Sequence, residues 1–165
     1  MKNLKFPCLS ITQPIGTFYI GVLSHKDLLE ISYVDQRRLE SEVDKYMGIQ
    51  RHLSKARVLK IGSYVNNIDA TFPTSVILSI DESNCSWRKK SMQLEIFETE
   101  DKKFGDIAKV LDGQHRIDGL KSLEKNVTFE LSVTIFVEVD LATQANIFST
   151  VNLAQTVTIQ RSQAA

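Results

Sequence analysis

An alternating run of apolar residues at positions 128–139 constrains the fold of this chain most strongly. The run places apolar side chains at every second position: Phe129, Leu131, Val133, Ile135 and Val137. A period of two is that of a β-strand with one buried face, and Phe136 on the other face predicts partial burial there as well. Such a strand needs neighbouring strands and packing layers, so the chain should fold around a sheet.

Further strands and helices are predicted on both sides of this run. Residues 6–11 and 17–23 flank a Pro-Ile-Gly turn and predict a β-hairpin. Buried strands are predicted at residues 75–80, 93–97 and 107–111. Helices are predicted to begin after Ser24, Ser54, Gly113 and Asp140. The sequence therefore predicts an α+β fold, a single domain over residues 1–165 with a mixed β-sheet and surrounding helices.

Two stretches are expected to lack regular structure. Residues 87–90 are basic apart from Trp87, the only tryptophan, and predict a surface loop with the indole packed down. The helix after Asp140 is expected to end near Asn152, where the sequence turns polar and irregular. The polar ending after Gln160 looks like the interruption of a longer sequence, so we expect a chain truncated at its C-terminus.

Composition narrows the classes of protein to consider. Lys plus Arg and Asp plus Glu both number 20, so any binding to nucleic acid must come from a local basic patch. The two cysteines form neither a disulfide framework nor a metal cluster, and the histidines lack zinc-ligand spacing, so no metal site is predicted. No signal peptide and no apolar run of about 18 residues is present, which predicts a cytoplasmic protein without membrane contact.

The most one-sided charge distribution lies between positions 45 and 67. This stretch has five basic residues and no acidic one. Its basic residues are Lys45, Arg51, Lys55, Arg57 and Lys60. A solvated helix face is one interpretation, and a patch that faces a polyanion such as DNA is the other. If the patch binds DNA, the residues that we predict to contact it are Arg51, Lys55, Arg57 and Lys60.

The second feature with chemical content is the stretch Asp112-Gly113-Gln114-His115-Arg116, which joins an apolar strand to a helix. A strand that turns through glycine into a helix leaves backbone N–H groups without partners at the helix start. Those donors suit an anion, and Arg116 can add a planar cationic fork for phosphate. We therefore predict an anion site at this turn.

Three polar residues of the turn also have a structural interpretation. Asp112 either caps the helix or holds a metal or a water, and Arg116 either binds phosphate or pairs with a carboxylate such as Asp118. His115 is either a packing residue or a proton acceptor, and the positive end of the helix favours its neutral imidazole.

The pentapeptide resembles the signature of the DGQHR-domain family, which includes the DndB-type proteins of DNA phosphorothioation. Two more elements occur in the family's order: Gln50-Arg51-His52-Leu53 resembles its QR-x-L segment, and Phe148 with Asn152 resembles its F-x-x-x-N element. The resemblance spans most of the chain. The DGQHR-domain family is similar in turn to the ParB/sulfiredoxin superfamily, which implies a ParB-like fold.

This resemblance implies a set of site residues. Gly113, Gln114, His115, Arg116 and Asn152 would bind a nucleotide phosphate, and Asp112 and His115 are the catalytic candidates. ATP or CTP with Mg²⁺ is the implied cofactor. Gln114 stands where sulfiredoxins have their reactive cysteine, which excludes sulfinic-acid reduction.

Three functional hypotheses follow. The first is a nucleotide- and DNA-binding domain of a DNA-modification or phage-defence locus, with slow NTP hydrolysis; Arg116→Ala should then abolish nucleotide binding and leave the fold intact. The second is a metal-dependent ParB-like nuclease that uses Asp112 and Asn152. The third is a non-enzymatic, DNA-binding transcriptional regulator in which the signature is structural. The expected partners are DNA and a nucleoside triphosphate, and a homo-oligomer is left open.

Overall fold

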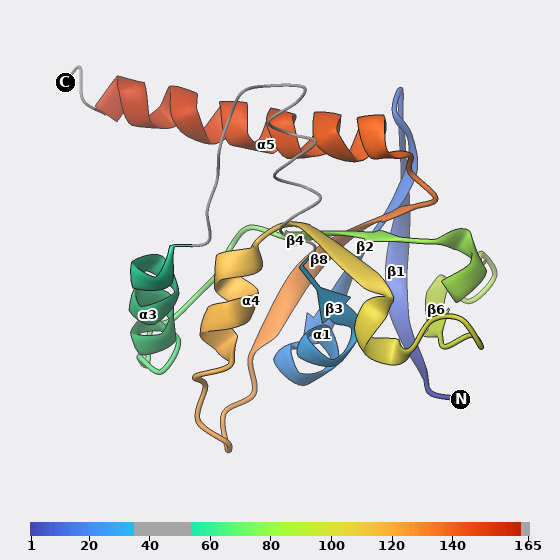
Figure 1. The fold of residues 1–165 in the computed structure, drawn as a ribbon, viewed down its shortest axis with the longest axis horizontal. Helices are drawn as coiled ribbons and strands as arrows, with labels where there is room; N and C mark the ends of the chain where they lie inside the picture. Colours follow the sequence, from blue (N-terminus) through green and yellow to red (C-terminus); the bar gives the residue numbers. More distant parts are fainter. Residues whose placement is uncertain (35–53, 163–165) are drawn as a thin grey trace.

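The computed structural model describes the backbone of residues 1–34 and 54–162, with side chains through residue 151. Its strands are β1 (Asn3–Gln13), β2 (Gly16–Ser24), β3 (Ser32–Tyr33), β4 (Val76–Ile80), β5 (Cys85–Arg88), β6 (Gln93–Phe97), β7 (Ala108–Asp112) and β8 (Glu130–Val137). Its helices are α1 (His25–Ile31), α3 (Lys55–Tyr64), α4 (Gln114–Leu120) and α5 (Leu141–Ser162), with 3₁₀ turns at Glu82–Asn84 and Phe104–Asp106. Figure 1 shows their arrangement.

The eight described strands form one mixed sheet in the order β3-β7-β4-β8-β2-β1-β6-β5. The pairs β3–β7 and β4–β8 are parallel, and the other neighbours are antiparallel. The predicted central strand is β8, between β4 and β2, with Leu131, Val133 and Ile135 almost completely buried. The α+β prediction is therefore confirmed.

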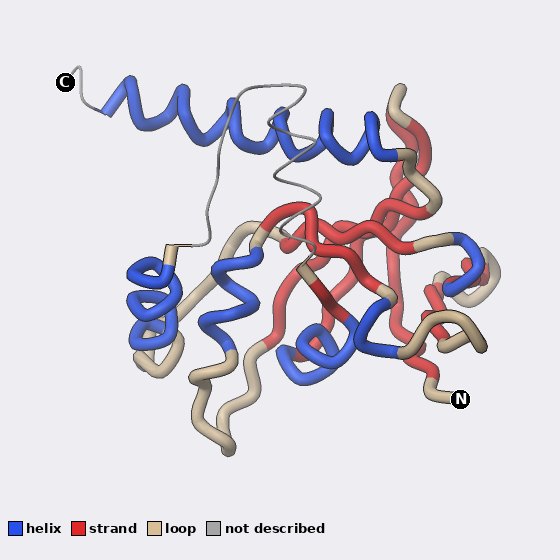
Figure 2. The backbone as a smooth tube through the Cα atoms, viewed as in Figure 1, coloured by secondary structure: helices blue, strands red, loops and turns tan. Residues whose placement is uncertain are grey.

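Two apolar clusters cover the two faces of this sheet. The larger one joins the inward side of β8 to α1 and α4, through residues such as Leu28, Ile31 and Leu120. The smaller one consists of Phe18, Leu111, Phe136 and Ile147. Figures 1 and 2 show α1, α3 and α4 on one side, whereas α5 lies across the opposite end of the molecule. The burial of Phe136 at 9% exposure confirms that the second face is partly covered.

Local signals placed the helix starts correctly. The hydroxyl of Ser24 accepts a hydrogen bond from the Asp27 amide, and the hydroxyl of Ser54 accepts one from the Arg57 amide. A carboxylate oxygen of Asp140 accepts from the Thr143 amide at 2.7 Å. These side chains satisfy amide groups that the first helical turn leaves without a partner.

Two predictions about regular structure were wrong. Cys85–Arg88 forms β5 rather than a loop, because it pairs with β6 as a hairpin and its Trp87 packs against Tyr19 with 4.8 Å between ring centroids. The helix after Asp140 does not end near Asn152 but continues to Ser162. Within it Ile147 and Ser149 are buried beside Ala145, whereas Leu141, Phe148 and Val151 are only partly buried.

Candidate functional site

The predicted strand–glycine–helix turn is present where β7 meets α4. Asp112 ends β7, Gly113 is the N-cap of α4, and Gln114 begins the helix. Gly113 has φ of 94° and ψ of 11°, a left-handed conformation that favours glycine. A Cβ atom at this position would lie 3.0 Å from Val76 Cγ2 and 3.1 Å from an Nη atom of Arg116. Both the backbone angle and the close packing therefore require glycine here.

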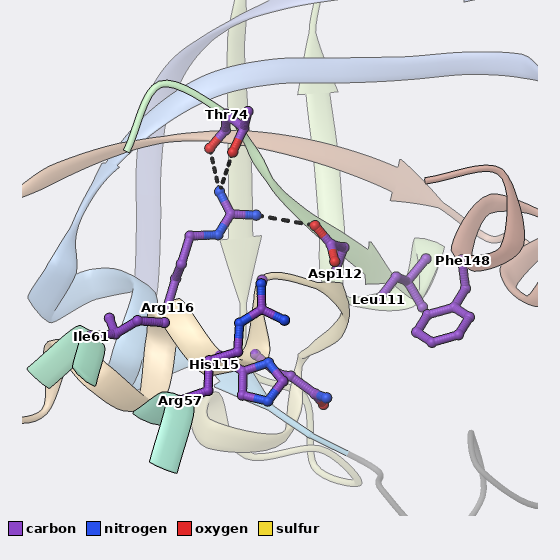
Figure 3. Close-up of a pocket in the computed structure, with 10 residues that line it drawn as sticks. Arg57, Ile61, Thr74, Leu111, Asp112, His115, Arg116 and Phe148 are labelled. Atoms are coloured by element: carbon purple, nitrogen blue, oxygen red, sulfur yellow. Dashed lines mark hydrogen bonds and ion pairs between the residues drawn. The ribbon is translucent and has the colours of Figure 1, made fainter. Parts of the chain in front are cut away.

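Arg116 is bound by the protein itself. Its Nη1 donates to the carbonyl and the hydroxyl of Thr74, and its Nη2 donates to Asp112 Oδ2 at 3.1 Å (Figure 3). Nη2 also donates to the Ser75 carbonyl at 3.1 Å. These bonds engage four of the five N–H groups of a guanidinium. The side chains of Arg116 and Asp112 are only 14% and 17% exposed. Burial lowers the pKa of Arg116, the carboxylate of Asp112 opposes that shift, and the nearby Arg57 adds to it.

This geometry shows the partners within the protein of two residues of the turn. Asp112 does not cap α4, because Gly113 occupies the N-cap position and Asp112 instead pairs with Arg116 one helical turn away. Arg116 does pair with a carboxylate, but with that of Asp112, whereas Asp118 pairs with Lys121. The Asp112–Arg116 pair therefore joins the end of β7 to the first turn of α4 and to the segment before β4.

His115 connects the same turn to α3. Its Nε2 accepts a hydrogen bond from the Ser54 backbone N–H at 3.1 Å. A ring nitrogen that accepts this bond carries no proton, so the geometry requires Nε2 to be deprotonated. Ser54 is the N-cap of α3, and its hydroxyl accepts from the amide of Arg57. Through this chain of contacts His115 fixes the start of the helix that carries Arg57.

Helices α3 and α4 pack closely through two glycines. A Cβ at Gly119 would overlap Ile61 Cγ2, and one at Gly62 would lie 2.8 Å from the Ser122 hydroxyl. The opposite side of α3 faces solvent, where Leu59 is 72% exposed. Lys55, Arg57 and Lys60 are also exposed on this helix. None of these three cations forms an ion pair with a residue that the structure describes.

A pocket of about 220 Å³ lies between α3, α4 and α5. Its lining residues are Arg57, Ile61, Thr74, Leu111, Asp112, Gly113, Gln114, His115, Arg116 and Phe148. Figure 3 shows these side chains from four separate segments around one space. Two guanidinium groups and a single carboxylate line the pocket, and that carboxylate is already paired with Arg116. Arg57 is therefore the cation in this pocket that remains available to an incoming anion.

The structure thus brings together most of the predicted site residues. The five residues of the turn and Arg57 share the pocket, whereas Lys55 and Lys60 lie on α3 outside its lining. Arg51 lies outside the described residues, and Asn152 is described only as part of the backbone of α5. Sequence reasoning missed Thr74, which reaches Arg116 across 42 positions. Only the antiparallel pairing of β4 with β7 could have indicated it, because that pairing places the start of β4 beside the end of β7.

Within residues 1–34 and 54–151, no group of three or more His, Cys, Asp or Glu side chains is arranged to hold a metal ion. No helix of the described part is long and apolar enough to span a bilayer.

The chain matches the family model described as DndB, DNA-sulfur modification-associated, over residues 6–164. The chain belongs to the DndB family. The family associates this chain with DNA sulfur modification, as the signature at residues 112–116 predicted. No curated protein and no solved structure gives a match. The likeness to ParB and sulfiredoxin therefore stays a prediction.

Proposed function

We propose that this DndB-family chain binds the phosphate backbone of DNA as a non-enzymatic regulator, and that its DGQHR turn is structural. The observation that carries the proposal is helix α3, on which Lys55, Arg57 and Lys60 are exposed and form no ion pair within the described residues. No acidic residue occurs in α3. Unpaired cations on one helix attract a polyanion and release its counterions on contact.

The state of the candidate catalytic groups supports binding rather than catalysis. Asp112 Oδ2 accepts a hydrogen bond from Arg116, so this ion pair competes with a metal or a water for the carboxylate. The Nε2 atom of His115 is occupied by the Ser54 amide. The two thiols are also unsuited to sulfur transfer, because burial raises the pKa of Cys8 and that of Cys85 to about 11 each.

The pocket beside α3 is proposed to receive one phosphate group of the backbone. Arg57 supplies a planar fork with several donors, which matches the oxygens of a phosphate. At about 220 Å³ the pocket is smaller than the range of about 300–1,000 Å³ typical of sites for small molecules, so a phosphate fits it better than a whole nucleotide.

The salt dependence of DNA binding tests this proposal. Fluorescence anisotropy with a labelled duplex should give an association constant that falls with salt. Each of Lys55→Ala, Arg57→Ala and Lys60→Ala should flatten the log–log slope by about 0.9, the contribution of one phosphate contact. Lys121→Ala is the matched control, because that exposed lysine already pairs with Asp118. An unchanged slope in the triple variant would contradict the proposal.

A nucleoside triphosphate is the second candidate ligand, and the combination of Arg57 with the Gly113 turn in one pocket favours it. ATP or CTP with Mg²⁺ would then bind with its terminal phosphate beside Arg57, and slow hydrolysis could follow. Isothermal titration calorimetry of each nucleotide against the wild type and Arg57→Ala separates the two ligands. Binding that Arg57→Ala removes would favour the nucleotide. DNA cleavage that requires Mg²⁺ or Mn²⁺ would instead indicate the nuclease.

A further inference from the structure

The sheet face opposite α1, α3 and α4 carries a row of apolar side chains, and α5 covers only one end of this row. On β2 the residues that point to this face are Phe18, Ile20 and Val22, and their exposure rises from 7% at Phe18 to 53% at Val22. On the neighbouring strand β1, Ile11 is partly buried and Leu9 is 57% exposed. Ile147 of α5 belongs to the same buried cluster as Phe18 at the covered end. The other end of the same face therefore keeps large apolar side chains in water.

This uncovered end forms a groove of about 550 Å³, which we name the β1–β2 groove. It is lined by Leu9, Ile20, Val22, Met92 and Ser132, together with Pro7, Cys8, Gly21 and Ser91, and none of these residues is charged. Met92 contributes a side chain that is 47% exposed, from a turn in which its φ is 50°. A non-glycine residue seldom adopts this left-handed backbone, and here it sets an apolar side chain beside the groove. An exposed apolar patch of this kind marks an interaction surface.

The charges at the borders of the groove indicate which partner fits. Lys89 and Lys90 lie in the turn that also carries Met92, and both are exposed. On the opposite border, Glu130 of β8 is exposed and points to the same face as Ser132, because alternate residues of a strand share a face. None of these three residues forms an ion pair with a described residue. The groove therefore has an uncharged floor, a basic border and an acidic border.

We propose that the β1–β2 groove is a self-association interface whose occupant is the same groove of a second copy of this chain. A two-fold axis through its centre places the basic border of one copy against the acidic border of the other. The two uncharged floors then meet without like-charge repulsion, and Leu9 and Val22 are removed from water. Helix α3 packs on the other side of the sheet, so a dimer of this kind leaves both basic helices exposed to DNA (Figure 2).

Sedimentation equilibrium of the full chain at increasing concentration tests the interface directly. The wild type should approach twice its mass of 18.7 kDa and dissociate on dilution. Leu9→Arg should weaken the dimer by at least about tenfold, because a two-fold interface contains each substitution twice. Val22→Arg provides a second variant in case the first folds poorly, as judged by circular dichroism. Leu59→Arg on α3 is the matched control, because Leu59 is a leucine outside the groove that is even more exposed than Leu9.

Charge reversal tests whether the second copy is the occupant. Glu130→Lys makes both borders basic and should weaken the dimer. Adding Lys89→Glu and Lys90→Glu to the same chain makes the borders opposite again and should restore it. Sedimentation as a monomer at every concentration, whatever else the groove binds, would overturn the proposal. A dimer that Leu9→Arg leaves unchanged, or a charge reversal that fails to restore association, would overturn it as well.

Discussion

Replacement of Arg116 by alanine should destabilise the fold rather than simply remove a ligand contact. Arg116 binds the Thr74 carbonyl and hydroxyl, the Ser75 carbonyl and Asp112. Truncation leaves the Asp112 carboxylate, which is 17% exposed, without its partner. Breaking a buried ion pair from one side costs about 3–5 kcal/mol. Because neither side chain is completely buried, we expect a loss near the lower end of this range, about 3 kcal/mol.

Urea denaturation followed through the fluorescence of Trp87, the only tryptophan, measures this loss. With an m-value of about 1–3 kcal/mol/M, the midpoint should fall by about 1–3 M. Arg57→Ala is the control, because Arg57 is exposed and unpaired within the described residues, and surface changes usually stay within about 0.5 kcal/mol. At a temperature where both variants are folded, Arg57→Ala should weaken DNA binding more than Arg116→Ala does.

A double-mutant cycle isolates the ion pair. Asp112→Ala, Arg116→Ala and the double variant together give the coupling energy, which should fall within about 0.5–3 kcal/mol for side chains in contact. The reasoning is refuted if Arg116→Ala unfolds at the wild-type midpoint. If a fully stable Arg116→Ala variant loses nucleotide or DNA binding, Arg116 binds phosphate directly, as the sequence predicted.

Three further changes follow from the same structure. Gly113→Ala should cost about 1–2 kcal/mol from its positive φ alone, and a lower urea midpoint checks it. Gly119→Ala should cost about 1–3 kcal/mol by overpacking against Ile61, and Ile61→Ala added to it should recover part of the loss in thermal melts; no recovery would contradict the contact. The pKa of Glu95 is lowered, chiefly by its hydrogen bonds from Arg88. The stabilising contribution of this carboxylate is therefore complete above the unfolded pKa of about 4.3. It is lost as the pH falls through the lower folded pKa. Glu95→Gln should therefore flatten the acid side of a stability–pH curve, and an unchanged curve would count against this ion pair.

The features that sequence reasoning found are those with local causes. Ser24 and Ser54 cap helices because a hydroxyl reaches an amide three positions later, and the residues on both sides are neighbours in the chain. The strand–glycine–helix turn was predictable for the same reason, since the apolar run and Gly113 are adjacent. The alternation in β8 predicted both its burial and the partly covered second face.

The features that sequence reasoning missed depend on distant segments. β5 is short and carries serine and arginine, and only its pairing with β6 makes it a strand. The partners of Arg116 at Thr74 and Ser75 follow from the neighbouring positions of β4 and β7 in the sheet. Spacing alone could not distinguish a phosphate-binding arginine from one that holds two segments together, because both stand at the first turn of a helix.

In the structure the five-residue signature links separate elements, and these links connect the stability of the fold with the placement of Arg57. Arg116 joins α4 to the segment before β4, and His115 joins the same helix to the start of α3. Arg57 lies in the first turn of α3 and its amide donates to the capping hydroxyl of Ser54, so its place beside the pocket depends on both links. If the DNA contact is on α3, changes in the signature act on affinity through the placement of Arg57, whereas changes at Arg57 itself act on affinity without loss of stability. Binding measured beside unfolding for His115→Ala and Arg57→Ala separates these two routes, because only the first should lose both.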